Sequence, residues 1–128
     1  EALTGLTIES LEDMETGAKK LDQMGGRHVL LKGGHRVGDA TDILRHGNQV
    51  THLTAERLET RNTHGTGCSY ASALATLLAQ GQPLATAAEQ AKLFISEAIR
   101  NNYPIGSGHG PVNHFAGAAA LARSPEEN

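Results

Sequence analysis

A short glycine-containing segment that runs into a strong helix former is the feature that most constrains this fold. Residues 61–68 read Arg-Asn-Thr-His-Gly-Thr-Gly-Cys, and residues 70–78 are rich in alanine and leucine. Turn-forming residues followed at once by good helix formers predict a loop and then a helix. With a strand predicted near residues 56–59, the order is strand, glycine loop, helix, which indicates an α/β protein.

Helices are predicted on both sides of this loop. Ser10 can cap a helix over residues 11–24, in which apolar residues recur at helical spacing. After the loop, Gly81 ends one helix and Pro83 begins another, which extends to about Asn101. The positions of this last helix that should face inward are Ala87, Ala91, Phe94, Ile95, Ala98 and Ile99.

Strands are predicted between the first helix and the loop. Residues 28–32 form a short apolar run closed by Gly33-Gly34, which indicates a buried parallel strand whose carboxyl end is the ligand side of a sheet. Residues 42–45 and 49–53 alternate weakly around His46-Gly47-Asn48. That pattern predicts a β-hairpin at a sheet edge.

The C-terminal part of the chain is less regular. Residues 106–114 are rich in glycine, residues 115–122 form an apolar patch, and residues 124–128 form a polar tail. The glycine-rich segment could border a ligand or close over it, but the geometry of a surface loop explains its composition equally well. His109 and His114 are therefore candidates only.

Charge and hydropathy exclude two classes of partner. The chain has 11 Lys and Arg residues against 14 Asp and Glu residues, a net charge of −3, and no basic run, so nucleic acid is not expected to bind. No stretch approaches the ~20 apolar residues of a membrane span, and no signal segment is evident. We expect a soluble, cytoplasmic protein whose 128 residues form one domain.

Cys68 is the only cysteine, and the seven histidines are scattered. An intrachain disulfide is therefore excluded, and no metal site made of protein ligands is predicted. His64 stands four residues before Cys68, but the glycines between them make a shared helix improbable, so a preformed Cys-His pair is not supported.

The glycine loop can bind an anion. Unpaired amides at a helix start, together with the positive end of the helix dipole, attract a phosphate, and glycine at positions 65 and 67 leaves room for it. A thiol at this position experiences the same field, which favours the thiolate, so Cys68 could accept a proton or bind as thiolate. A plain strand-to-helix turn with a small buried cysteine stays open as the alternative.

Three motifs occur in a specific order: Lys32-Gly33-Gly34-His35, then residues 63–68, then residues 108–115, which read Gly-His-Gly-Pro-Val-Asn-His-Phe. In this order they resemble hydroxymethylpyrimidine/phosphomethylpyrimidine kinase. The resemblance implies a ribokinase-like three-layer α/β/α fold. This chain would be its C-terminal half: part of a mostly parallel sheet with flanking helices and a hairpin.

The resemblance also implies the chemistry. Such kinases transfer the γ-phosphoryl group of ATP, with Mg²⁺, to a hydroxymethylpyrimidine and then to its monophosphate, in thiamine biosynthesis. Carried over by position, Gly65, Thr66, Gly67 and Cys68 would form the anion hole. Cys68 would in addition be the base on the substrate hydroxyl, where most ribokinase relatives have aspartate.

Two further residues are candidates for ATP binding. Lys32, at a strand end, could neutralise the phosphates of ATP, although a solvated loop lysine is equally consistent with the sequence. Thr63 could offer its hydroxyl to a phosphate or to Mg²⁺, although a threonine before a helix more often bonds local backbone groups.

Proteins of this family carry a further half before the matching region. The pyrimidine pocket and an Asn-x-x-Glu segment linked to Mg²⁺ lie mainly there. We therefore expect residues 1–128 to be the C-terminal part of a single domain, inactive alone, with a sheet flank that invites either a homo-oligomer or a missing N-terminal half.

Other functions stay open. A pyridoxal-type vitamin kinase would have a similar nucleotide half. Cys68 could instead be a covalent nucleophile for acyl transfer, with His64 nearby. A noncatalytic nucleotide-binding module is the third class, since the phosphate loop is present without a full substrate pocket.

Overall fold

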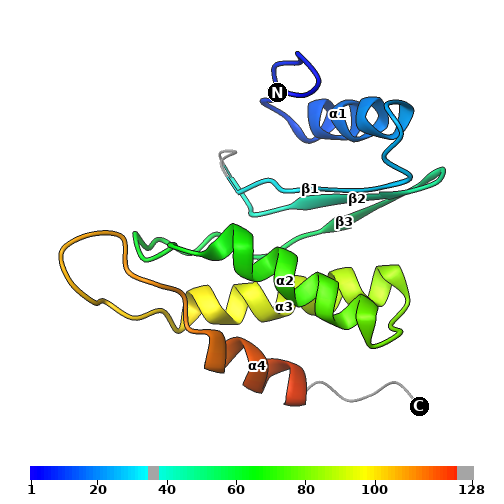
Figure 1. Cartoon of the computed structure of the whole chain (residues 1–128). Coiled ribbons are helices and arrows are strands. Elements are labelled where there is room, and N and C mark those ends of the chain that lie inside the picture. The colour runs from blue at the N-terminus through cyan, green and yellow to red at the C-terminus, as the bar shows by residue number, and fades with distance from the viewer. Residues whose placement is uncertain (35–37, 124–128) are drawn as a thin grey trace. The chain divides into compact units, whose positions relative to one another are not determined.

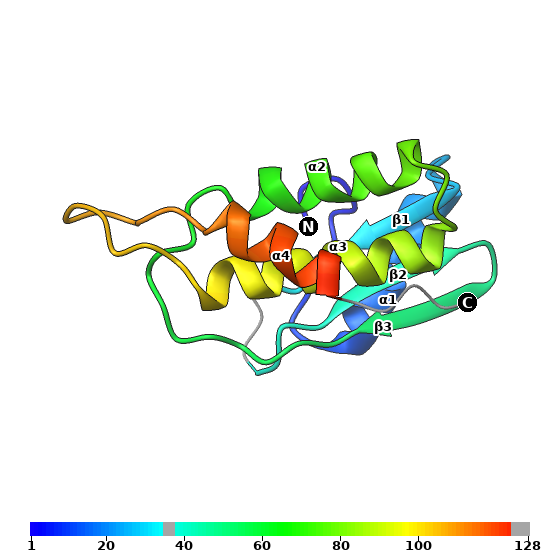
Figure 2. The same ribbon diagram turned by 90° about the horizontal axis from the view of Figure 1, so that it is seen from below.

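The computed structural model describes residues 1–34 and 38–123, so His35 of the first motif and the tail of residues 124–128 lie outside the described residues. The elements follow one another as shown in Figures 1 and 2. They are α1 (Leu11–Gln23), β1 (His28–Leu31), β2 (Asp42–His46), β3 (Gln49–Leu53), α2 (Thr66–Ala79), α3 (Leu84–Arg100) and α4 (His114–Arg123). The chain forms two compact units, Glu1–Arg57 and Leu58–Asn128, and each is described by itself.

In the first unit, α1 packs on the sheet. Its start is fixed by a capping box, in which the Ser10 hydroxyl accepts the Asp13 amide and the Asp13 carboxylate accepts the Ser10 amide. The core between α1 and the sheet is apolar, as burial of one helix stripe requires. Its buried members are Met14, Ala18, Val29 and Ile43. The predicted helix is confirmed, with Met24 as its C-cap.

The sheet has the order β1-β2-β3, and both strand pairs are antiparallel. The predicted hairpin is confirmed, with a turn at Gly47, whose φ is +58°. A parallel strand was expected at residues 28–32. For the pairing that the structure describes this expectation is wrong, because β1 runs antiparallel to β2 from His28↔His46 to Leu31↔Ile43. A parallel neighbour needs a crossover of about a dozen residues or more, whereas a loop suffices for an antiparallel one.

The strand predicted near residues 56–59 is also wrong. Pairing continues from β2 and β3 into the segments beside them and ends at Ala40 and Ala55, which exchange two backbone hydrogen bonds. Beyond that point, the Arg57 side chain turns to the loop after β1 and donates to backbone carbonyls there. The chain that leads to the glycine loop is therefore irregular.

The second unit consists of α2, α3 and α4 (Figures 1 and 2). The helix after Pro83 is confirmed, and of its expected inward positions Ala87, Ala91, Ile95 and Ala98 are fully buried. The apolar patch of residues 115–122 is helix α4. It crosses α3 closely, since a Cβ atom on Gly117 would lie 2.7 Å from the Phe94 carbonyl oxygen. No helix in the described part of the chain has the length and apolarity needed to cross a membrane.

Candidate anion site at the start of helix α2

Residues 65–68, called the anion loop below, form the start of α2. Gly65 is the N-cap, with φ +86° in the left-handed region that glycine adopts readily and without a side-chain cap. The helix begins at Thr66, so Gly67 and Cys68 lie in its first turn, as expected for a glycine loop at a helix start. This position directs their amides along the helix axis, out of the N-terminus.

Most amides of the anion loop are open. The Thr66 amide donates to the Thr63 carbonyl oxygen (3.2 Å), and the Ser69 amide donates to Gly65 (2.9 Å). Across residues 1–34 and 38–123, no protein acceptor is found for the amides of Gly65, Gly67 and Cys68. Three donors and the positive end of a 14-residue helix are thus available to an anion.

The side chains of the anion loop differ in their surroundings. The Thr66 hydroxyl donates to the Thr63 carbonyl oxygen at 2.7 Å, so it serves the local turn. Cys68 is a free thiol and is exposed. The alternative of a small buried cysteine is therefore excluded. Thr63 is exposed as well.

The third sequence motif lies beside the anion loop. Its residues 109–112, called the brace below, run next to residues 61–64. His64 and Pro111 form a parallel β-bridge, in which the His64 amide donates to Gly110 (3.1 Å) and the Val112 amide donates to His64 (3.3 Å). The segment that enters the anion loop is therefore held by residues 46 to 48 positions later in the chain.

Side chains strengthen this contact. A ring nitrogen of His109 lies 2.9 Å from the carbonyl oxygen of Arg61. The buried Asn62 accepts the Gly110 amide through Oδ1 (3.0 Å) and donates through Nδ2 to Asn102 Oδ1 (2.7 Å). Sequence reasoning missed Asn62, although it belongs to the segment that was singled out, because its partners lie 40 and 48 residues away.

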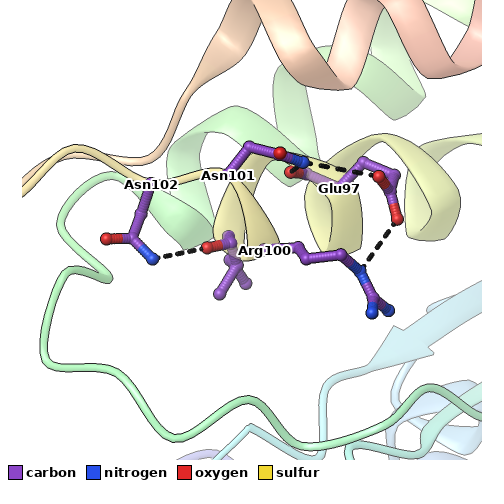
Figure 3. A network of polar contacts seen from close by, with 5 residues as sticks. Glu97, Arg100, Asn101 and Asn102 are labelled. Carbon is purple, nitrogen blue, oxygen red and sulfur yellow. Dashed lines mark hydrogen bonds and ion pairs between the residues drawn. The ribbon is translucent and has the colours of Figure 1, made fainter.

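Asn102 connects this contact to the end of α3. Its Nδ2 donates to the Ile99 carbonyl oxygen at 2.8 Å (Figure 3). The neighbouring Asn101 bonds only within the helix end in the described interactions, to the backbone and carboxylate of Glu97, which also pairs with Arg100 (Figure 3). Asn62 is thus anchored to a helix terminus whose carbonyls are satisfied by side chains.

A pocket opens beside the anion loop within the second unit. Its volume is about 540 Å³, and it is lined by side chains of α2 and α4 together with Phe94 of α3 and Gln80, the C-cap of α2. Cys68 and Ser69 lie at one end with His114, whose Nε2 is 2.7 Å from the Ser69 hydroxyl. From the sequence His114 was no more than a candidate. In the structure it lines a pocket that reaches the anion loop.

Lys32 belongs to the first unit, where it follows β1 and is exposed. The loop around it is tightly held. The Gly33 amide donates to the buried Asp42 carboxylate (2.9 Å), and Arg57 donates to the carbonyls of Gly33, Gly34 and Gly38. Lys32 and the anion loop belong to separate units of the structure.

The family model for phosphomethylpyrimidine kinase matches residues 1–113. The thiamine biosynthesis bifunctional protein ThiED of Geobacter sulfurreducens is 50% identical over 119 residues, which are 92% of this chain and 24% of that protein. The hydroxymethylpyrimidine/phosphomethylpyrimidine kinase of Bacillus subtilis is 47% identical over 118 residues, 91% of this chain and 44% of that protein. The chain thus spans less than half of these relatives.

Solved structures give the same picture of the fold. The pyridoxal kinase from Staphylococcus aureus in complex with AMP-PCP and pyridoxal superposes with a TM-score of 0.86 at 33% identity, over 89% of this chain and 44% of that one. A phosphomethylpyrimidine kinase from Clostridium difficile superposes with a TM-score of 0.64 at 34% identity, over 77% of this chain and 38% of that one.

Proposed function

The chain belongs to the phosphomethylpyrimidine kinase family and has part of a ribokinase-like α/β fold, and on that premise we propose that it supplies the ATP-binding, anion-stabilising part of a kinase. The proposed acceptors are 4-amino-5-hydroxymethyl-2-methylpyrimidine and its monophosphate, in thiamine biosynthesis. The names of the curated relatives support this choice of acceptor. The observation that carries the proposal is the set of open amides at Gly65, Gly67 and Cys68.

In the proposed first transfer, the bond between the γ-phosphorus of ATP and its bridging oxygen breaks while the substrate hydroxymethyl oxygen bonds to that phosphorus. The amides of Gly65, Gly67 and Cys68 would donate to the equatorial oxygens, whose charge they stabilise without reorganising. The exposed Cys68 thiolate would take the proton of the hydroxyl. Thr66 would complete the anion hole; at present its amide and hydroxyl both bond Thr63, which shapes the loop.

The second transfer needs less from Cys68. Its acceptor is the phosphate of the monophosphate product, which is already ionised near neutral pH. No proton has to be removed from an alcohol, so this step depends mainly on alignment of the two phosphates. Cys68 would then contribute its backbone amide rather than its sulfur.

Mg²⁺ would enter with the nucleotide. This ion prefers oxygen ligands and often retains substrate phosphates and water in its shell. Within the described residues no three His, Cys, Asp or Glu side chains form a group that could hold a metal. The exposed hydroxyl of Thr63 is the one ligand that we propose for this chain, with Lys32 neutralising phosphate charge.

A chimera tests the proposal. The segment of the Bacillus subtilis kinase that matches this chain is replaced by it, and phosphoryl transfer from ATP to the hydroxymethylpyrimidine is measured. We expect transfer that is lost in the Cys68→Ala chimera and kept in part in the Cys68→Asp chimera. A folded chimera without transfer would contradict the proposal, and loss of activity with Asp would favour a covalent nucleophile.

Pyridoxal kinase is the second candidate, because similar solved structures include several pyridoxal kinases with TM-scores of 0.82 to 0.86. Phosphoryl transfer from ATP to pyridoxal, measured in the same chimera, shows whether this nucleotide-binding half also supports phosphorylation of pyridoxal. ATP or ADP binding by the chain alone, without transfer in any context, would instead support a noncatalytic nucleotide-binding module.

A further inference from the structure

A preorganised anion site needs amides that are held in place before the ligand arrives. The anion loop cannot provide this by itself, because Gly65 caps α2 without a side chain and the loop contains two glycines, which are flexible in the absence of other contacts. The contacts that fix the loop must therefore come from the chain around it.

The described contacts converge on one residue. Asn62 is only 9% exposed, and both ends of its amide are used, Oδ1 by the Gly110 amide and Nδ2 by Asn102. The backbone amide of Asn62 donates to the Thr60 hydroxyl at 3.1 Å. Two residues later, the backbone of His64 pairs with both sides of Pro111. Asn62 thus joins the entry of the anion loop to the brace and to the end of α3.

The brace has no room for a side chain at Gly110, where it contacts Asn62. A Cβ atom on Gly110 would lie 2.6 Å from Asn62 Oδ1 and would also meet the Tyr103 carbonyl oxygen. Gly108, two residues earlier, has no atom within 4 Å of such a Cβ position. The requirement for glycine is therefore local to the point where Asn62 bonds the brace.

We propose that Asn62 is a positioning residue for phosphoryl transfer: its side-chain amide locks the brace against residues 61–64 and so sets the anion loop before nucleotide binds. This inference rests on the proposed function of the loop. Asn62 would touch neither ATP nor the acceptor, and its effect would pass through the backbone of His64 to the amides of the anion loop.

The first test needs no ligand. Amide hydrogen exchange at His64 and Val112, both of which donate across the bridge, is compared in the chain, in Asn62→Ala and in Asn101→Ala. Asn101 is the matched control, because its described bonds stay within the end of α3 (Figure 3). We expect exchange at both amides to accelerate about tenfold or more in Asn62→Ala only. Unchanged exchange in a folded Asn62→Ala variant overturns the inference.

Asn62→Asp covers the case in which Asn62→Ala does not fold. A carboxylate can still accept the Gly110 amide but cannot donate to Asn102, so we expect intermediate exchange. Asn102→Ala removes the same second bond from the other side, together with the bond from Asn102 to Ile99, so its exchange should be at least as fast as in Asn62→Asp. Exchange at the control's level in both variants would contradict the role that we assign to this side chain.

The second test uses Mg·AMP-PCP, a nucleotide that keeps a γ-phosphate. Affinity is measured by calorimetry on folded protein well below the unfolding midpoint, and we expect a loss of about tenfold in Asn62→Ala and less than about twofold in Asn101→Ala. Equal affinity of Asn62→Ala and the unmodified chain would overturn the inference. If the unmodified chain binds no AMP-PCP, the proposed function fails, and the exchange experiment still decides whether Asn62 fixes the loop.

Discussion

At the scale of single residues, neighbouring positions of the first turn of α2 have opposite surroundings. Cys68 is exposed at the end of the pocket, whereas Ser69 is buried and bonded to His114. A helix turns by about 100° per residue, so one of two neighbours can face a ligand while the other faces the protein. The proposed division of roles follows from this: Cys68 acts on substrate and Ser69 holds the helix start.

Replacing the Cys68 thiol should separate the two transfers. In the active chimera, we predict that Cys68→Ala lowers kcat for the hydroxymethylpyrimidine by about 100-fold or more, the contribution of a positioned base. The same change should lower kcat for the monophosphate by less than about tenfold, because that acceptor is already ionised. Initial rates with each acceptor measure the effect. An equal loss for both acceptors would exclude the role of base.

The anion-loop residues could be predicted from the sequence because their chemistry is local. Glycines next to a helix former specify a helix start with open amides, whatever the rest of the chain does. Asn62 and Arg57 could not be predicted in this way. Arg57 bonds carbonyls 19 to 24 residues earlier, and Asn62 bonds residues 40 and 48 positions later, so their roles exist only in the folded chain.

At the scale of elements, the start of α1 depends on pH. The Ser10 hydroxyl, and then the amides of Glu9 and Ser10, lower the pKa of Asp13 from its ordinary value of 3.8. A lowered folded-state pKa means that the carboxylate stabilises the fold above pH 3.8. This stabilisation is lost as the pH falls through the folded-state value.

Asp13→Asn should therefore weaken the acid sensitivity of α1. We predict that its thermal midpoint lies below that of the unmodified chain at pH 6 and that the difference shrinks toward pH 3. Circular dichroism melts at the two pH values measure it. Glu12→Gln, in the same first turn but outside the capping box, is the control. A difference that is the same at both pH values would argue against the capping-box carboxylate as its cause.

The brace is an element without regular structure, and Gly110 within it can be compared with Gly108 just before it. Gly110→Ala should destabilise the second unit by about 1–3 kcal/mol, because the new Cβ has no room beside Asn62 and Tyr103. Gly108→Ala, in open space, should change stability by less than about 0.5 kcal/mol. Urea unfolding measures both. Equal effects would mean that the close contact at Gly110 does not restrict the brace.

Helices were predicted more accurately than strands. The helices α1 and α3 follow from caps and apolar spacing, both of which are local. The direction of the partner of β1 is set by tertiary pairing, which a short apolar run does not specify. The start of α2 is local as well, since the glycine loop was expected at a helix start and α2 begins at Thr66 within it.

At the scale of the whole molecule, the chain contains a helix start with open amides but spans 44% or less of the two curated relatives named above. In the described sheet, β1 and β3 are the outer strands. Outer strands present unpaired backbone groups that can accept another strand. We propose that residues outside the matched region of the relatives supply the pyrimidine pocket, while this chain supplies the anion loop.

An amide NMR titration of the chain with Mg·AMP-PCP, a nucleotide that keeps a γ-phosphate, tests most directly whether the anion loop binds the group to be transferred. We predict that the amide resonances of Gly65, Gly67 and Cys68 shift with one common dissociation constant, as their open N–H groups acquire a phosphate acceptor. Resonances in α1 should stay in place. Saturable nucleotide binding that leaves those three amides unmoved, or no binding at all, would contradict the proposed function.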